Sequence, residues 1–374
     1  MQQADINMAE KENAIHVLML PRSAFGHLMP FFQLSIALAK AGVHVSFIST
    51  PKKIQRLPKI PSTLSHSVHF VQLPLPSLDN ELLAEGAEAT VDIPFEKVQY
   101  LKAAYDQMQH SVKQFVANQS PDCIICDFSP HWIIDIALEF QVKLIFFSVL
   151  FVHAATFLGL PGTRKAPPEW VSDSGKCFQG LLPVDRAQRE RERERGIVDE
   201  CSGKNKIFEW LDKQASKSVV FVGFGSECKL SKDQVSEIAY GLEESQLLLL
   251  WALRKPSWAS NDQDSLPVGW GSVIETLQFG RSLVVLLFLA DLPLNARLLV
   301  NKGLAIEVRR NEDGSFTRND IGTSLRQAMV LEEGKKIRIN TREAAAIVGN
   351  LKLHQDHYIV AFVLFLKDGI WKQI

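Results

Sequence analysis

The fold is decided near the amino terminus by one stretch, IHVLMLPRSAFGHLMPFFQLSIALAKAGVHVSFIS (residues 15–49). Its first six residues form a short apolar run, which is typical of a strand buried on both faces. After a turn, apolar residues recur at helical spacing from His27 until Gly42, and glycine is favoured just past a helix end. A second apolar run covers 43–49. This order predicts a β-loop-α-β unit that opens a doubly wound parallel sheet.

The same alternation of apolar runs and helical patterns continues along the chain. In the first half, strands are predicted at 68–73, 123–126 and 143–149, and helices at 96–118 and 132–140. In the second half, strands are predicted at 218–224, 247–253 and 283–289, and helices at 273–279, at 295–301 and after capping boxes at Ser231 and Thr317. We therefore expect an α/β protein with two Rossmann-like domains, each with a parallel sheet.

Composition limits the classes of function. A length of 374 residues suits two domains, and 41 basic against 42 acidic side chains give a net charge of −1. Without a basic field, binding to nucleic acid or to an anionic membrane is not expected. The longest uncharged run, 144–160, is shorter than the roughly 20 residues that span a bilayer. No transmembrane segment is therefore predicted.

Cysteine usage and the first residues predict the compartment. Five cysteines are too few for a disulfide framework in so long a chain, and the number is odd. Residues 1–13 contain acids and lack the apolar core of a signal peptide. We expect a cytoplasmic protein in a reducing compartment.

Two residues of the first half carry candidate chemistry. His27 follows the turn after the first strand, and Asp127 follows the strand at 123–126. The carboxyl ends of parallel strands share one edge of a sheet, where ligands bind. Imidazole is a general base at neutral pH, and a neighbouring carboxylate would orient it. The alternative is that His27 only begins a helix and Asp127 only caps the next one.

No metal site is predicted from the sequence. Cys123 and Cys126 have the spacing of a redox or zinc motif, but on a strand they face opposite sides, and no second cysteine pair is present. Structural cysteines are the better interpretation. His354 and His357 lie close together on a predicted helix without a third ligand, and we expect them at the surface.

Several turns of the second half suit a phosphate. Gly225-Ser226 and Gly271-Ser272 precede or open predicted helices, where free N–H groups and the helix dipole favour anions. Glu275 follows on the first turn of its helix and could accept sugar hydroxyls. Together these signals predict a nucleotide diphosphate between two Rossmann-like domains.

Read together, six segments resemble the plant family-1 UDP-dependent glycosyltransferases. They are PRSAFGHLMPFFQL (21–34), IICDFSPHW (124–132), VVFVGFGSECKL (219–230), GWGSVIETLQFG (269–280), DLPLNARL (291–298) and LKLHQDHYIVAF (351–362). The GWGS form, with glycine where most of the family has asparagine, is similar to the branch-forming group. Those enzymes add rhamnose or glucose to a sugar already on a flavonoid or triterpenoid.

The resemblance implies the GT-B fold, in which two Rossmann-like domains with parallel sheets face a cleft. It also implies an inverting, metal-independent displacement with UDP-sugar as co-substrate and no cofactor. By carry-over from the family, His27 is the base and Asp127 its charge partner. The residues carried over to the donor are Ser226, Trp270, Gly271 and Ser272 near the diphosphate, Glu275 on the ribose and Asp291 on the sugar.

The chain also departs from the family. Leu266-Pro267-Val268-Gly269 runs straight into Trp270-Gly271-Ser272, so the Trp-Ala-Pro-Gln stretch that stacks on uracil and a phosphate-contacting histidine are absent. Leu292 replaces a sugar-contacting glutamine, and a second stretch is missing between Lys176 and Gly180. A lost stacking platform and a lost phosphate contact, at about 1–3 kcal/mol each, predict a fall in donor affinity of about two to four orders of magnitude.

The predicted organisation follows from these segments. We expect an acceptor-binding domain at 1–183, truncated near 176–180, a charged linker at 184–210, and a UDP-sugar-binding domain at 211–350, lacking donor residues near 269–270. A last helix within 351–374 should pack back on the first domain. We expect a monomer whose function is transfer of rhamnose or glucose to a hydroxyl of a flavonoid or triterpenoid glycoside. The alternative is a non-catalytic homologue that binds small apolar glycosides or a partner chain but not UDP-sugar.

Overall fold

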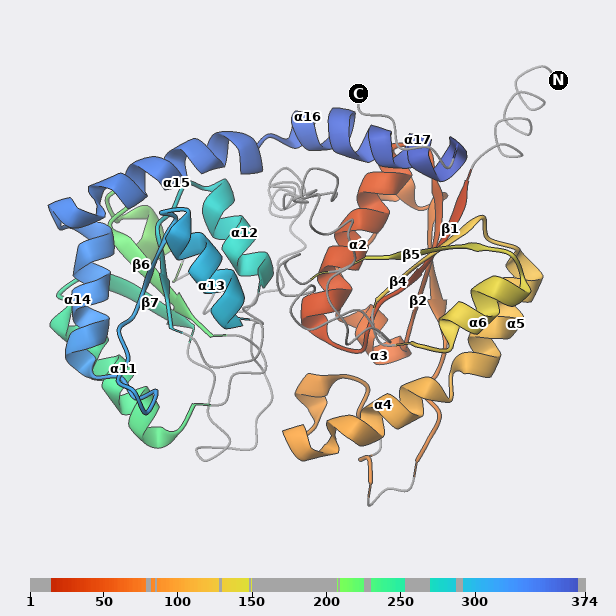
Figure 1. Ribbon diagram of the computed structural model, residues 1–374, viewed down its shortest axis with the longest axis horizontal. Coiled ribbons are helices and arrows are strands. Elements are labelled where there is room, and N and C mark those ends of the chain that lie inside the picture. The colour runs from red at the N-terminus through yellow and green to blue at the C-terminus, as the bar shows by residue number, and fades with distance from the viewer. Residues whose placement is uncertain are drawn as a thin grey trace. The chain divides into compact units, whose positions relative to one another are not determined.

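The computed structural model of the chain describes residues 15–78, 82–84, 86–127, 130–147, 149, 207, 209–224, 230–252, 270–286 and 292–368. The chain divides into two compact units (Figure 1). Unit 1 consists of Met1–Leu182 and Lys352–Ile374, and unit 2 of Pro183–Leu351. Nearly all of the predicted charged linker, like the predicted deletion near 176–180, lies outside the described residues.

Unit 1 is built on a five-stranded parallel sheet, as the sequence predicts. Its strands are β1 (His16–Leu20), β2 (His44–Ser49), β3 (Val68–Gln72), β4 (Cys123–Cys126) and β5 (Lys143–Phe146), in the order β3-β2-β1-β4-β5. The strand order reverses between β1 and β4, which pair with Leu20 opposite Cys126. In open α/β sheets, such a reversal leaves a crevice at the carboxyl ends of the two strands.

Helices cover both faces of this sheet (Figure 1): α2 (Phe25–Lys40), a π-helical turn (His354–Ile359) and α17 (Val360–Asp368) pack on one face, and α5 (Gln109–Gln119) and α6 (Ile133–Glu139) pack on the other. The unit also contains α3 (Pro51–Gln55) and α4 (Val98–Asp106), and α16 (Leu351–Leu353) begins at the last residue of unit 2. The single helix predicted at 96–118 is wrong, because the backbone breaks between α4 and α5. There the N–H of Met108 bonds the carbonyl of Tyr105 across a tighter turn, and α5 begins afresh.

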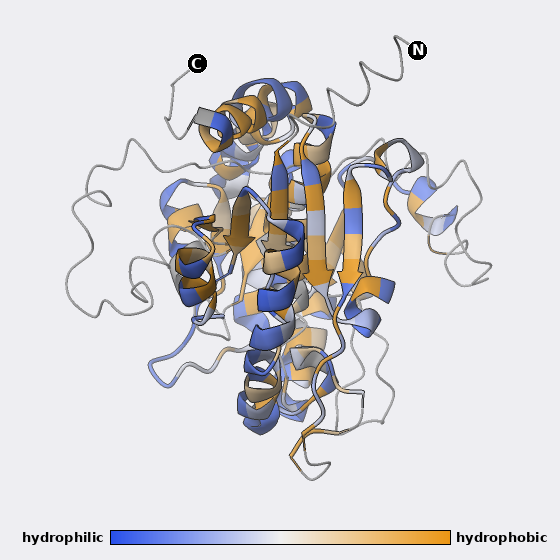
Figure 2. Ribbon diagram, turned by 90° about the vertical axis from the view of Figure 1, so that its right-hand side faces the viewer, coloured by the Kyte–Doolittle hydropathy of each residue, from blue (hydrophilic) through white to orange (hydrophobic). Residues whose placement is uncertain are grey.

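Alternate residues of β1 enter two separate cores. Val17 and Met19 pack with α2 and with residues of α17, whereas Leu18 and Leu20 pack with α5 and α6. A strand buried on both faces reads as a continuous apolar run, which explains the pattern at 15–20. The strands of this sheet accordingly appear mainly in the hydrophobic colour in Figure 2.

The cysteines of β4 behave as structural residues. Cys123 joins the core beside α2, and Cys126 joins the core on the opposite face, as strand geometry predicts. Both are free thiols, and burial raises the pKa of each to about 12. They therefore stay protonated and inert at neutral pH.

The surface position predicted for His354 is wrong. Its side chain is buried, with an exposed fraction of 4%, and it lies in the π-helical turn between α16 and α17. A π-helical turn contains an extra residue and shifts the phase of the helix face, which a period of 3.6 residues does not reproduce. In the same turn, Gln355 donates from Nε2 to the carbonyl of Ala37 in α2.

Unit 2 has a second α/β set. Its strands are β6 (Val219–Gly223), β7 (Leu248–Ala252), β8 (Leu283–Val285) and β9 (Ala305–Glu307), and its helices are α11 (Lys232–Glu244), α12 (Trp270–Gln278), α13 (Leu292–Asn301), α14 (Arg318–Met329) and α15 (Lys335–Val348). Strands β6 and β7 pair in parallel, as do β8 and β9. Both predicted capping boxes are present, at Ser231 and at Thr317. The three-residue β9 was not predicted, since so short a run gives no periodic signal.

Candidate active site

The predicted base lies at the start of the first helix. His27 is on the first turn of α2, directly after the β1 turn, and its backbone N–H bonds the carbonyl of Ala24, the N-cap residue. The position next to Ala24 in the turn, Ser23, is also buried, so the entry to the helix is held in the protein interior. The imidazole itself keeps 12% of its surface exposed. The backbone of this residue is therefore held in the protein interior, while part of its imidazole ring is exposed to solvent.

The predicted partner reaches the same place from the neighbouring strand. Asp127 follows β4 directly, and its N–H bonds the carbonyl of Leu20 at the end of β1. Its carboxylate is fully buried, and Oδ2 lies 2.5 Å from Nδ1 of His27. The structure thus joins two residues that are 100 positions apart in the sequence.

The hydrogen bond between the two side chains sets the chemistry of the imidazole. A carboxylate only accepts, so the proton of this bond belongs to Nδ1. That tautomer carries its basic lone pair on Nε2 and is oriented by the carboxylate, which also stabilises the imidazolium once a proton is taken. The arrangement is suited to removing a proton from a hydroxyl group.

Two aromatic side chains lie near the turn that leads to His27. Tyr105 of α4 donates its hydroxyl to the carbonyl of Pro21, in the turn before α2, and its ring lies beside that of Trp132. Burial raises the pKa of Tyr105, and the charge of Asp127 raises it further. The phenol therefore stays protonated and keeps donating to the turn. Sequence spacing did not indicate Tyr105, because this bond spans 84 residues.

The residues predicted for the donor belong to unit 2, and the structure describes them only in part. Ser226 and Asp291 lie outside the described residues. Trp270, Gly271 and Ser272 form the first turn of α12, and Glu275 lies on the second turn, with the backbone alone described for all four. The first N–H groups of a helix have no partner within the helix. The backbone of 270–272 is thus placed where N–H groups can meet an anion.

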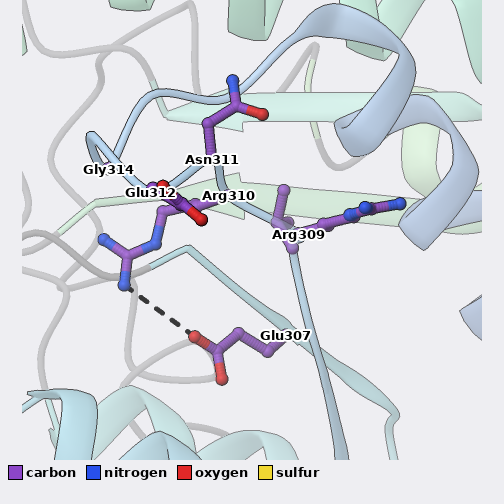
Figure 3. Close-up of a pocket in the computed structure, with 7 residues that line it drawn as sticks. Glu307, Arg309, Arg310, Asn311, Glu312 and Gly314 are labelled. Atoms are coloured by element: carbon purple, nitrogen blue, oxygen red, sulfur yellow. Dashed lines mark ion pairs between the residues drawn. The ribbon is translucent and has the colours of Figure 1, made fainter.

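A separate pocket lies in unit 2, in the loop that follows β9 (Figure 3). Its lining residues are Glu307, Val308, Arg309, Arg310, Asn311, Glu312 and Gly314. The Arg310 guanidinium lies 3.9 Å from the Glu307 carboxylate, so opposite charges offset each other inside the pocket. None of the residues predicted from the sequence lines it.

Neither a metal centre nor a membrane span is found in the described part of the chain. Among the described residues, no group of three or more histidine, cysteine, aspartate or glutamate side chains could hold a metal ion. No helix in that part of the chain is both long and apolar enough to cross a bilayer.

The sequence is similar to those of known plant glycosyltransferases. No family model matches the chain. It is 33% identical to UDP-glycosyltransferase 91A1 of Arabidopsis thaliana, over 94% of this chain and 96% of that protein. It is 30% identical to soyasaponin III rhamnosyltransferase of Glycine max, over 96% of each. The first alignment extends over 455 positions, more than the 374 residues of this chain, so that relative contains internal segments with no counterpart here.

Solved structures resemble the chain over nearly its whole length. The structure of Arabidopsis thaliana UGT89C1 complexed with UDP gives a TM-score of 0.69 at 20% identity and covers 92% of this chain and 99% of that one. The structure of Glycyrrhiza uralensis UGT73P12 complexed with glycyrrhetinic acid 3-O-monoglucuronide gives 0.72 at 19% identity and covers 95% and 96%. At these identities the likeness concerns the fold.

Proposed function

Because this chain belongs to the plant UDP-glycosyltransferase family, we propose that it transfers rhamnose or glucose from a UDP-sugar to a hydroxyl of a flavonoid or triterpenoid glycoside. The family and its GT-B fold were both predicted from the sequence, and both predictions are confirmed. The acceptor class is supported by relatives such as the soyasaponin rhamnosyltransferase. The observation that carries the proposal is the 2.5 Å hydrogen bond between His27 and Asp127.

The proposed reaction is a single inverting displacement. Nε2 of His27 takes the proton of the acceptor hydroxyl while the oxygen of that hydroxyl forms a bond to the anomeric carbon of the donor. The bond from that carbon to the β-phosphate oxygen breaks with its electron pair, and UDP leaves. Asp127 stabilises the imidazolium that forms.

The donor side is proposed to work without a metal or cofactor. Backbone N–H groups of 270–272 on α12, together with Ser226, would meet the charge that grows on the leaving diphosphate. Glu275 would accept the ribose hydroxyls, and Asp291 would contact the sugar. The proposal further includes a monomeric protein in the cytoplasm, and the free thiols of Cys123 and Cys126 are consistent with a reducing compartment.

Calorimetric titration with UDP tests the proposal. Binding in the micromolar range supports a transferase, whereas no heat at millimolar UDP supports the non-catalytic alternative. A second experiment tests the base: His27→Ala should abolish sugar transfer to glycoside acceptors and leave the UDP titration unchanged. Undiminished turnover in that variant would remove His27 from the mechanism.

A further inference from the structure

A lysine is buried behind the candidate active site. Lys53 lies on α3, the short helix that follows β2, and only 1% of its surface is exposed. Its Nζ donates to Oγ of Ser23 at 2.9 Å and lies 5.7 Å from the centre of the Tyr105 ring. In the described part of the chain, no carboxylate forms an ion pair with it. Its neighbour Lys52 is exposed instead and donates to the carbonyl of Gly86.

The partner of this lysine belongs to the turn that leads into α2. Residues 21–24 of this turn are held from three directions. Tyr105 donates to the carbonyl of Pro21, the N–H of Thr90 donates to the carbonyl of Ser23, and Lys53 donates to the Ser23 side chain. Ala24, the last residue of this turn, is the N-cap of α2, and its carbonyl accepts the hydrogen bond from the N–H of His27. A shift of this turn would therefore move the imidazole.

An ammonium group in this place is costly to the fold. Burial lowers the pKa of Lys53 to about 8, and the charges of Glu88 and Asp92 only partly oppose the effect. An apolar side chain of similar length would avoid that cost. Residues whose pKa is strongly shifted by burial and nearby charges are concentrated at functional sites.

We propose that Lys53 is a positioning residue for the His27 base: its hydrogen bond to Ser23 holds the turn at 21–24 and thereby the imidazole against Asp127. Lys53 itself touches neither the acceptor nor the donor. The kinetic part of this inference rests on the proposed function, whereas its structural part concerns the His27–Asp127 bond alone.

Four variants separate this role from ordinary packing. Lys53→Met removes the donor and keeps an apolar chain of similar length, and Ser23→Ala removes the acceptor. The double variant shows whether the two act through one bond. Lys52→Met is the matched control, because it makes the same substitution at the preceding position of α3, on a lysine that bonds Gly86 rather than the turn.

The primary measurement does not need activity. The proton shared by Nδ1 of His27 and Asp127 should give a far-downfield NMR signal, assigned by selective histidine labelling and by its absence in His27→Ala. We expect Lys53→Met and Ser23→Ala to shift or broaden this signal to a similar extent, the double variant to add little, and Lys52→Met to leave it in place. An unchanged signal in Lys53→Met, an equal change in Lys52→Met, or additive effects of the two single variants would each overturn the inference.

Kinetics give the second measurement. In Lys53→Met we expect kcat to fall about tenfold with little change in the acceptor KM, because a small misplacement of a base affects the transition state more than binding. Should Lys53→Met fail to fold, Ser23→Ala carries the same test, and an unchanged histidine signal in it overturns the inference. If the wild-type chain binds no UDP and transfers no sugar, the proposed function fails, while the NMR signal still decides the role of Lys53.

Discussion

Replacing Lys53 by methionine should stabilise the protein, and by an amount that depends on pH. In the folded chain, burial lowers the pKa of this lysine from 10.5 to about 8. Below pH 8 the ammonium is charged both in the folded and in the unfolded chain, so the folded state bears the full cost of burying it. Between pH 8 and 10.5 the folded chain releases the proton while the unfolded chain keeps it. The unfavourable contribution of Lys53 therefore disappears as the pH rises through this window.

The size of the effect follows from the same pKa values. A difference between 10.5 and about 8 corresponds to about 3 kcal/mol at pH 7. Loss of the hydrogen bond to Ser23 offsets about 1 kcal/mol. We therefore expect Lys53→Met to raise the free energy of unfolding by about 2 kcal/mol at pH 7. At pH 9.5 the cost of the wild-type lysine has fallen by about 2 kcal/mol, and the advantage of the variant should nearly vanish.

Urea-induced unfolding of both proteins at pH 7 and pH 9.5, followed by tryptophan fluorescence, measures this difference. Lys52→Met serves as the control, since that lysine is exposed and should give no comparable gain at either pH. The reasoning is refuted if Lys53→Met is less stable than the wild type at pH 7. It is also refuted if the gain is the same at both pH values, because the cost would then not come from a buried charge.

Three further predictions concern unit 1. Asp127→Asn keeps the shape of the side chain but removes the charge beside His27, so kcat for sugar transfer should fall by up to about 10⁴-fold in steady-state assays; unchanged turnover would contradict this role. Phe362→Ala empties a site in the core shared by α17 and α2 and should lower the free energy of unfolding by about 3–5 kcal/mol in urea titrations, whereas a loss below about 1 kcal/mol would show that the site is poorly packed. Burial lowers the pKa of His16, so the contribution of this residue to stability should be constant above pH 6.5 and decrease as the pH falls below it; in thermal melts, a His16→Asn variant should lose less between pH 7 and 5 than the wild type.

The positions of the candidate base and its partner were predictable because each residue follows a recognisable local sequence pattern. His27 and Asp127 both follow an apolar run that is long enough for a strand but too short for a helix. The carboxyl ends of parallel strands lie at one edge of the sheet, so both residues were expected there. The sequence left open whether the two strands are neighbours. The structure supplies this step through the pairing of β1 with β4.

The buried contacts next to the His27–Asp127 pair could not be predicted from the sequence. Lysine is rarely found in protein cores, so a sequence pattern assigns Lys53 to the surface together with Lys52. Its bond to Ser23 spans 30 residues and joins the short helix α3 to a turn, and neither is long enough to give a periodic pattern. The break between α4 and α5 was missed for a related reason. Tyr105, Met108 and Val112 are all buried at spacings that a single continuous helix would also satisfy.

The geometry of the base is independent of the donor segment that the chain is predicted to lack. His27, Asp127, Lys53 and the turn at 21–24 all belong to unit 1, whereas the residues predicted to hold UDP belong to unit 2. We therefore expect the absence of the uracil-stacking stretch to lower donor affinity without disturbing the hydrogen bond at Nδ1. It follows that the two properties should separate in experiment. The His27 signal should persist in the wild-type chain whatever the outcome of the UDP titration, and a sequence change that strengthens donor binding should increase transfer without any change in unit 1.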